Sequence, residues 1–444
     1  MFKTLVNAFK VKDIRNRIFF TLGILLVFRI GCIFITIPGV DAATIQATLD
    51  SILGTEANVL LGMFSGGSLE QMSVFALNVT PYITSSIIIQ LLTIAIPALE
   101  ELQRDGEDGR KKMNAITRYV TVLLGIIESA GLAISLQQAN ALGTDANALT
   151  VVTMIITLTA GSTLVMWLGE RITEKGIGNG ISIILLINIV SRMPNDFSNL
   201  YTMFVKSQFK DAEYVKGIGA ILVIVAVVIL TTILVILLQD AKRNIPIQYS
   251  QKMSGRRMVG GRATEMPLKV NTAGVIPIIF ASSLLSMPAM IVRLFKINIT
   301  NKVLQEIVSS LSQDSWFTKA HPWGYVGLAL YVVLVLMFAY FYTSITFNPM
   351  EVANNLKKSG ASIPGIRPGK PTQEYLEKVL KYIIFIGAVG LVIIALIPIF
   401  FSGVFNAQVS FGGTSLIIIV GVIIETMQQL DSKMLERNYE GFLK

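Results

Sequence analysis

Residues 18–37 read IFFTLGILLVFRIGCIFITI, a stretch of twenty residues in which only Arg29 is charged. A helix rises about 1.5 Å per residue, so this stretch is long enough to cross the roughly 30 Å of hydrocarbon in a bilayer. Basic residues precede it, whereas the connection that follows, residues 38–73, contains no lysine or arginine. The stretch therefore predicts a membrane-spanning helix whose N-terminal end faces the cytoplasm.

Nine further apolar segments follow along the chain, at residues 74–96, 116–136, 149–169, 180–191, 217–238, 271–292, 323–347, 383–404 and 411–430. The lysines and arginines gather in alternate connections: of 37, we place 28 on one side of the membrane, 8 on the other and Arg29 within a span. Because positive charge is retained in the cytoplasm, both termini are predicted to be cytoplasmic. We expect an all-α polytopic membrane protein with ten transmembrane helices.

The composition agrees with a membrane bundle, since 53% of the residues are hydrophobic and 15% are charged. The net charge of +9 is concentrated on the cytoplasmic side, where it could meet anionic lipid, ribosomal RNA or an acidic protein. The single cysteine, Cys32, lies in the first span and allows no internal disulfide. No small-residue cleavage site follows the long first apolar run, so we expect it to be a retained helix.

The sequence offers little for catalysis. The one histidine, His321, falls in an extracytoplasmic connection. The glycine-rich stretch 174–180 follows a hydrophobic helix and has no Gly-Lys-Ser/Thr ending, so it does not predict a phosphate-binding loop. We therefore predict neither an enzyme, nor a cofactor, nor a metal site, and any energy input must come from a partner or a gradient.

The second span is unusual at its start. The glycine-broken segment at residues 60–71 is too short to span and too apolar for a free loop, so it must lie inside protein or beside a water-filled cavity. Pro81 is expected to remove a hydrogen bond within the following helix. Val79 and Ile83 are four residues apart and would share one helix face. Ordinary packing of a kinked helix is the alternative interpretation at this point.

The seventh span echoes the second, because residues 271–283, NTAGVIPIIFASS, again contain a proline, a central apolar pair and a double serine. The echo predicts two inverted-repeat halves of five spans, residues 1–215 and 216–444. Intramembrane charges are few, namely Arg29, Glu128 and Glu425, and an Arg29–Glu128 pair is one arrangement that would satisfy two of them. Such a pathway is apolar and poor in ligands for a solute, but a secondary carrier with an inverted repeat and a scaffold without a pore remain alternatives.

Five stretches resemble the SecY family, in order and at matching spacings: residues 75–92 (FALNVTPYITSSIIIQLL), 169–182 (GERITEKGIGNGIS), 267–284 (PLKVNTAGVIPIIFASSL), 347–372 (FNPMEVANNLKKSGASIPGIRPGKPT) and 411–416 (FGGTSL). The GIRPG loop is similar to the bacterial form of the family. The resemblance implies a protein-conducting channel that passes unfolded secretory polypeptides across the bacterial cytoplasmic membrane and releases transmembrane segments laterally into the bilayer.

The resemblance also implies three sets of site residues within this channel. The apolar pore ring would consist of Val79, Ile83, Leu185, Ile279, Ser283 and Ile418. The plug, at about residues 60–71, would include Leu60, Gly62, Met63, Phe64, Ser65, Gly66, Gly67 and Ser68. The lateral gate would carry Thr80, Gln90 and Asn271.

The cytoplasmic connections at about residues 240–270 and 348–382 are long and basic, and solvated charge is the default interpretation of such loops. The resemblance implies instead that they bind partners through Lys242, Arg243, Arg256, Arg257, Lys357, Lys358 and Arg367. The implied partners are SecE, SecG, the motor ATPase SecA, the ribosome, preproteins that carry a signal sequence, and membrane lipid.

Overall fold

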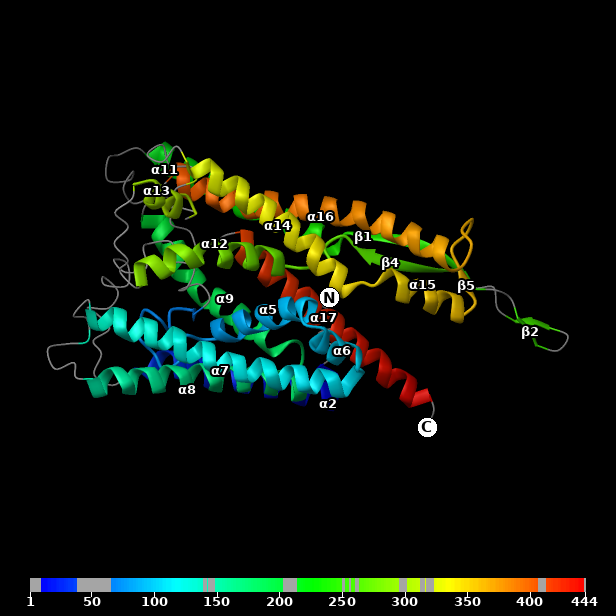
Figure 1. Cartoon of the computed structure of the whole chain (residues 1–444), viewed down its shortest axis with the longest axis horizontal. Helices are drawn as coiled ribbons and strands as arrows, with labels where there is room; N and C mark the ends of the chain where they lie inside the picture. Colours follow the sequence, from blue (N-terminus) through cyan, green and yellow to red (C-terminus); the bar gives the residue numbers. More distant parts are fainter. Residues whose placement is uncertain are drawn as a thin grey trace.

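The computed structural model describes residues 9–37, 65–138, 142, 148–202, 214–249, 252–254, 257–259, 263–294, 302–311, 316, 323–405 and 413–442. Most of these residues are helical, and the long helices run side by side (Figure 1). Helices from the first half of the chain occupy the lower part of the view and helices from the second half the upper part, with α17 crossing between them.

The first half of the chain contributes α2 (Lys12–Phe34), α5 (Thr80–Ala95), α6 (Pro97–Arg104), α7 (Gly106–Gln138), α8 (Ala148–Lys175) and α9 (Gly180–Leu200). Helix α7 packs on α5 and α8, and α8 also contacts α2 and α9. The short helix α6 turns away from α5 by 106° and lies against α7.

The second half contributes α11 (Tyr214–Asp240), α12 (Ile276–Leu294), α13 (Lys302–Ser310), α14 (Gly324–Thr346), α15 (Pro349–Lys358), α16 (Lys370–Phe405) and α17 (Gly413–Phe442). Here α14 packs on α12 and α16, while α16 also contacts α11 and α17. The two halves therefore share a packing pattern. Helix α14 has the place of α7, between α12 and α16 as α7 is between α5 and α8, and α16 has the place of α8, with α11 and α17 where α8 has α2 and α9. The pattern supports the predicted repeat, although α11 already begins at Tyr214, just before the predicted boundary.

Six described helices are long and apolar enough to cross a membrane, or seven if α5 and α6 form one bent span. Shorter apolar stretches occupy Gly180–Asn195 in α9, Val225–Asp240 in α11 and Ile276–Leu285 in α12. Each of the ten predicted spans falls on one of these helices. The apolar helical bundle is therefore confirmed, whereas the exact number of spans stays a prediction.

Several predicted span ends differ from the helix ends in the structure. Helices α5 and α12 begin later than predicted, at Thr80 and Ile276, because each is preceded by turns. Helix α9 begins as predicted, where the Asn179 side chain accepts hydrogen bonds from the first turn, but it continues to Leu200 through Pro194. The short predicted fifth span is thus a longer helix.

The connections at residues 240–270 and 348–382 contain short strands, which the sequence did not predict, within a fold that is otherwise mostly helical. Strand β1 (Lys242–Tyr249) pairs antiparallel with β4 (Ala263–Lys269) and with β5 (Ala361–Ser362), giving the order β4-β1-β5. A hairpin of β2 (Lys252–Ser254) and β3 (Arg257–Val259) extends beyond this sheet (Figure 1). The later connection is also largely helical, because α15 and the start of α16 lie within it.

The sheet has its own apolar core, which joins both connections to α16. Ile245 and Leu268 from the sheet pack with Ile363, Leu376 and Val379. We call β1, β4, β5, α15 and the first turns of α16 the sheet unit.

The close approach of α8 to the turns before α5 predicts a strict size limit at Gly161. A Cβ there would overlap the Val74 carbonyl oxygen, whereas a Cβ at Gly23 in α2 would meet nothing within 4 Å. We expect Gly161→Ala to destabilise the purified protein by about 1–3 kcal/mol through overpacking, and Gly23→Ala to leave it unchanged or more stable. Thermal unfolding in detergent measures both, and equal midpoints for the two variants would contradict this packing.

Candidate functional site

Five of the six predicted ring residues lie together in one apolar cluster that draws on both halves of the chain. The buried members are Val79 in the turns before α5, Leu185 in α9 and Ile418 in α17. The partly buried members are Ile83 in α5 and Ile279 in α12. We call these five residues the constriction. Ser283 lies one turn beyond Ile279 in α12, and its side chain is exposed.

The start of α5 sets the position of the first two members. Asn78 has a left-handed backbone with φ of 49°, Val79 is the residue before the helix, and Pro81 sits in the first turn. Pro81 therefore begins the helix and does not kink it as predicted, because a proline at this position sacrifices no helical hydrogen bond. The Ile83 amide donates to the Val79 carbonyl at 3.0 Å, so the two residues remain one turn apart.

Helix α12 begins in the same way, which gives the sequence echo a structural meaning. Gly274 is left-handed with φ of 64°, and Pro277 is the second residue of the helix. The Ile279 amide donates to the Val275 carbonyl at 3.2 Å, as Ile83 does to Val79. Val275, which the sequence prediction omitted, packs against the same cluster. Val275 precedes Pro277 by two residues, as Val79 precedes Pro81, and this shared spacing could have predicted it from the sequence.

Residues 65–79, which we call the turn segment, form a buried run of turns between α2 and α5. The predicted plug residues Ser65, Gly66, Gly67 and Ser68 belong to it, whereas Leu60, Gly62, Met63 and Phe64 lie outside the described residues. The side chains of Ser65 and Ser68 are buried. Only the second part of the predicted plug, from Ser65 onwards, therefore lies within the described residues.

Side chains from two elements satisfy the backbone of the turn segment. Arg29 in α2 donates to the Gly66 carbonyl at 3.1 Å, so the anticipated Arg29–Glu128 pair is wrong. The Ser68 hydroxyl lies 2.8 Å from the Ser65 carbonyl oxygen and 3.0 Å from that of Phe75, while Asn78 Nδ2 donates to Ser65 at 3.3 Å. These bonds replace the helical hydrogen bonds that the segment lacks.

Close packing holds the turn segment against its neighbours. The rings of Phe75 and Phe28 in α2 stack with centroids 5.8 Å apart. A Cβ added to Gly66 would lie 2.7 Å from Oδ1 and 2.9 Å from Cα of Asn188 in α9. Helices α2, α8 and α9 therefore enclose the segment.

Two of the predicted gate residues, Thr80 and Gln90, lie on α5 and the third, Asn271, lies just before α12; the three share no hydrogen bond among the described residues. Gln90 Nε2 in α5 donates to Ser86 Oγ at 3.2 Å. Thr80 is the first residue of α5 and is half-buried. Asn271 is buried in the turns before α12, where the neighbouring Thr272 hydroxyl lies 3.0 Å from that of Thr343 in α14. These contacts link each side of the expected gate internally.

Most of the predicted partner-binding residues that the structure describes lie on the sheet unit or in the loop that joins its elements. Arg243 on β1, Lys357 and Lys358 at the end of α15, and Arg367 are exposed. Lys242 pairs with Asp240 at 3.4 Å. Arg256 lies outside the described residues, and Arg257 begins β3 in the hairpin.

The backbone around Arg367 is tightly constrained. Ile363 to Ile366 form a turn, closed by a hydrogen bond of 3.0 Å, with Gly365 at φ of 80°. This is the conformation that a proline–glycine pair favours. The buried Thr372 hydroxyl donates to the Arg367 carbonyl at 2.8 Å. The exposed guanidinium therefore stands on a rigid loop.

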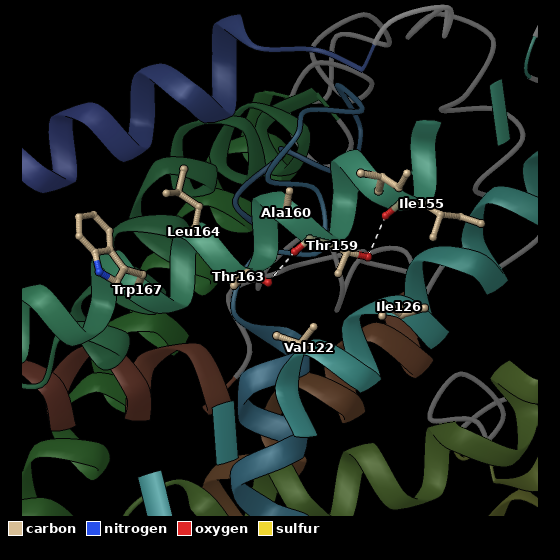
Figure 2. A pocket seen from close by; sticks show the side chains of 9 residues that line it. Val122, Ile126, Ile155, Thr159, Ala160, Thr163, Leu164 and Trp167 are labelled. Atoms are coloured by element: carbon tan, nitrogen blue, oxygen red, sulfur yellow. Dashed lines mark hydrogen bonds between the residues drawn. The ribbon is translucent and has the colours of Figure 1, made fainter. Parts of the chain in front are cut away.

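An apolar groove of about 770 Å³ lies between α7 and α8, apart from the constriction (Figure 2). Val122 and Ile126 line it from α7, and Leu164 and Trp167 from α8. The hydroxyls of its threonines donate to carbonyls one turn earlier in α8, as the dashed lines in Figure 2 show. The groove thus presents no free polar group for catalysis and suits contact with hydrocarbon.

An apolar helical bundle with a constriction between two repeated halves defines the class of membrane channels. Residues 73–427 match the family model described as SecY. The protein translocase subunit SecY of Bacillus subtilis is 43% identical over 452 residues, with 100% of both chains covered. The chain belongs to the SecY family.

Two solved structures share the fold. One is a SecY protein whose plug domain is described as stabilising the closed state of the translocation channel and maintaining a membrane seal; it has a TM-score of 0.65 and 18% identity, and covers 94% of this chain and 92% of that one. The other is Sec61 in the canine ribosome–channel complex from the endoplasmic reticulum, with a TM-score of 0.58, 17% identity and the same coverage, 94% and 92%.

The contact between Gly66 and Asn188 predicts different effects for two adjacent glycines. Gly66 and Gly67 are both left-handed, but a Cβ at Gly67 would meet nothing within 4 Å. In a Cys32→Ser, Ser68→Cys background, we expect Gly66→Ala to increase maleimide labelling of the buried thiol several-fold by displacing the turn segment. Gly67→Ala carries the same backbone cost, about 1 kcal/mol, without the clash, so equal labelling in both variants would contradict this contact.

Proposed function

We propose that this chain is a protein-conducting channel of a bacterial cytoplasmic membrane, with both termini in the cytoplasm. It passes unfolded secretory polypeptides through the constriction and releases transmembrane segments laterally into the bilayer. The observation that carries the proposal is the convergence of five aliphatic side chains from both halves of the bundle in one cluster. Membership in the SecY family supports it.

The constriction suits a channel that must accept any side chain. A ring of aliphatic groups offers no hydrogen bonds, so water leaves it and ions do not pass. Aliphatic side chains can also change rotamer and part around an extended polypeptide. Helix α9 of the first half contacts α17 of the second half, and each contributes one side chain to the constriction, Leu185 and Ile418. A small separation of the two halves would therefore widen the constriction.

The turn segment and the residues before it form the plug in this proposal. Residues at 60–68 would seal the closed channel next to the constriction. The described part is buried, and Phe75 and Val79 of the same segment belong to the apolar cluster that holds the constriction. The plug function described for the related SecY structure supports the same role here.

The lateral gate would open between α5 and α7 on one side and α12 and α14 on the other. Thr80, Gln90 and Asn271 are polar groups along these edges. Hydrogen bonds between membrane helices are worth only about 0.6 kcal/mol on average. Burial of a signal sequence's apolar side chains in the opened gate outweighs such bonds, so an apolar segment can part the helices.

The sheet unit is the docking surface for cytoplasmic partners in this proposal. The ribosome is one, supported by the canine ribosome–channel complex, and SecA is the other, supplying the energy that the channel lacks. The partner surface consists of Lys242, Arg243, Arg256, Arg257, Lys357, Lys358 and Arg367. SecE and SecG are the proposed partners within the membrane.

The proposal predicts that a moving polypeptide touches the constriction. In a Cys32→Ser background, Ile83→Cys should form a disulfide with a single cysteine in a preprotein that is stalled during transit, in the presence of SecA and ATP. Reconstitution with the partner subunits and gel analysis measure the crosslink.

The matched control is Ile126→Cys, which places the thiol on the exposed groove between α7 and α8 and should not crosslink. If the preprotein is translocated but never crosslinks at position 83, this constriction is not the pathway.

The rigid Arg367 loop predicts a specific defect in motor-driven export. Arg367→Glu should leave the amount of assembled protein unchanged and reduce SecA-stimulated translocation at least tenfold, because it reverses the charge that grips the partner. Arg367→Lys should be intermediate, since an ammonium cannot replace bidentate guanidinium contacts. The control Lys112→Glu changes an exposed lysine of α7, outside the sheet unit. Equal translocation by both charge reversals would remove Arg367 from the partner surface.

A further inference from the structure

An ion pair fastens the turn segment to α9. Arg192 Nη1 in α9 lies 2.7 Å from Glu70 Oε1, and the two side chains are only 15% and 25% exposed. Glu70 stands at the end of the predicted plug region, residues 60–71, and Arg192 lies beyond the span first predicted for this helix. Neither residue was a predicted site residue.

The position of this pair distinguishes it from the local ion pairs within single helices of the described structure. Arg171–Glu174 and Lys111–Asp108 join neighbours within one helix, and their side chains are more exposed. Such surface pairs contribute little to stability. In contrast, the Glu70–Arg192 pair connects a non-helical segment to a separate apolar helix, where leaving either charge without the other is costly.

The same face of α9 holds the turn segment at a second point. Gly66 packs against Asn188, which lies one helical turn before Arg192. From the opposite side, Arg29 in α2 donates to the Gly66 carbonyl. The segment from Gly66 to Glu70 is therefore held at both ends, by packing at one and by charge at the other.

One member of the constriction, Leu185, lies on the same helix. Leu185 precedes Asn188 by three residues and Arg192 by seven, and residues at these spacings share a helix face. Because Leu185 and Arg192 share α9, a displacement of this helix at Leu185 would also shift Arg192 relative to Glu70. The opening of the constriction and the release of the turn segment are thus mechanically connected.

We propose that the Glu70–Arg192 ion pair is a latch, which holds the plug on α9 in the closed channel and breaks when a polypeptide widens the constriction. This inference rests on the proposed function of the turn segment as part of the plug. Arg192 and Glu70 act as positioning residues, because they hold the seal in place and do not line the constriction.

Charge reversal tests the latch in the full chain, reconstituted in vesicles with chloride efflux as the measurement. Glu70→Arg or Arg192→Glu alone places like charges together and should raise resting efflux about tenfold, which corresponds to about 1.4 kcal/mol in the closed–open equilibrium. The double reversal, Glu70→Arg with Arg192→Glu, should return efflux to within about twofold of the parent. Rescue by the swapped pair is a result that a purely structural role for either residue would not give.

Four further variants help to interpret the result, with efflux normalised to the amount of inserted chain. Arg171→Glu, which breaks an exposed pair on α8, should not change efflux. Glu70→Gln and Arg192→Gln should give smaller increases, and they replace the reversals if those chains do not insert. Val79→Gly combined with Ile83→Gly tests the constriction independently of the latch.

The outcomes separate the two proposals. If the glycine variant leaks while the charge variants stay tight, or if the double reversal leaks as much as the single ones, the latch is overturned and the channel stands. If the glycine variant is itself tight, the proposed sealing function fails, and the latch fails with it.

Discussion

The whole arrangement depends on how non-helical backbone is satisfied at membrane depth. Inside a bilayer an unpaired amide or carbonyl costs several kcal/mol, so residues 65–79 are stable only where protein groups replace water. The structure provides them: Ser68 and Asn78 bond carbonyls within the segment, Arg29 bonds Gly66, and the backbone of residues 35–37 pairs with residues 72–74. Because these partners lie on α2 and within the segment itself, they also fix where α5 begins.

The constriction follows from the way two helices begin. In each half a left-handed residue, Asn78 or Gly274, reverses the chain two residues before a helix that opens with a proline in its first turn. Each start places a valine and an isoleucine one turn apart, facing the same apolar cluster. The constriction therefore combines similar helix starts from both halves of the chain, and the packing of the long helices brings these starts together.

Local patterns in the sequence predicted the helices, because hydrophobic runs depend on neighbouring residues, whereas the members of the constriction came from the resemblance to the SecY family. Features that depend on distant partners could not be predicted. The sheet needs β5 to pair with β1 across more than a hundred residues, and Arg29 meets a backbone carbonyl that leaves no sequence signature. The late start of α5 rests on left-handed Met72 and Asn78, a conformation that is uncommon outside glycine. The plug residues before Ser65 lie outside the described residues, so their prediction stands untested.

The two ends of the pathway are attached to different halves of the bundle. The turn segment is held by α2, α8 and α9 of the first half, whereas the core of the sheet unit continues into α16 of the second half through Val379 and Ile383. Helix α16 in turn packs on α11, α14 and α17. If the sheet unit is the docking surface, as proposed, a partner that pulls on it acts on the second half, whereas the turn segment is held by the first. The constriction takes side chains from both halves, so a movement of one half relative to the other would change its width.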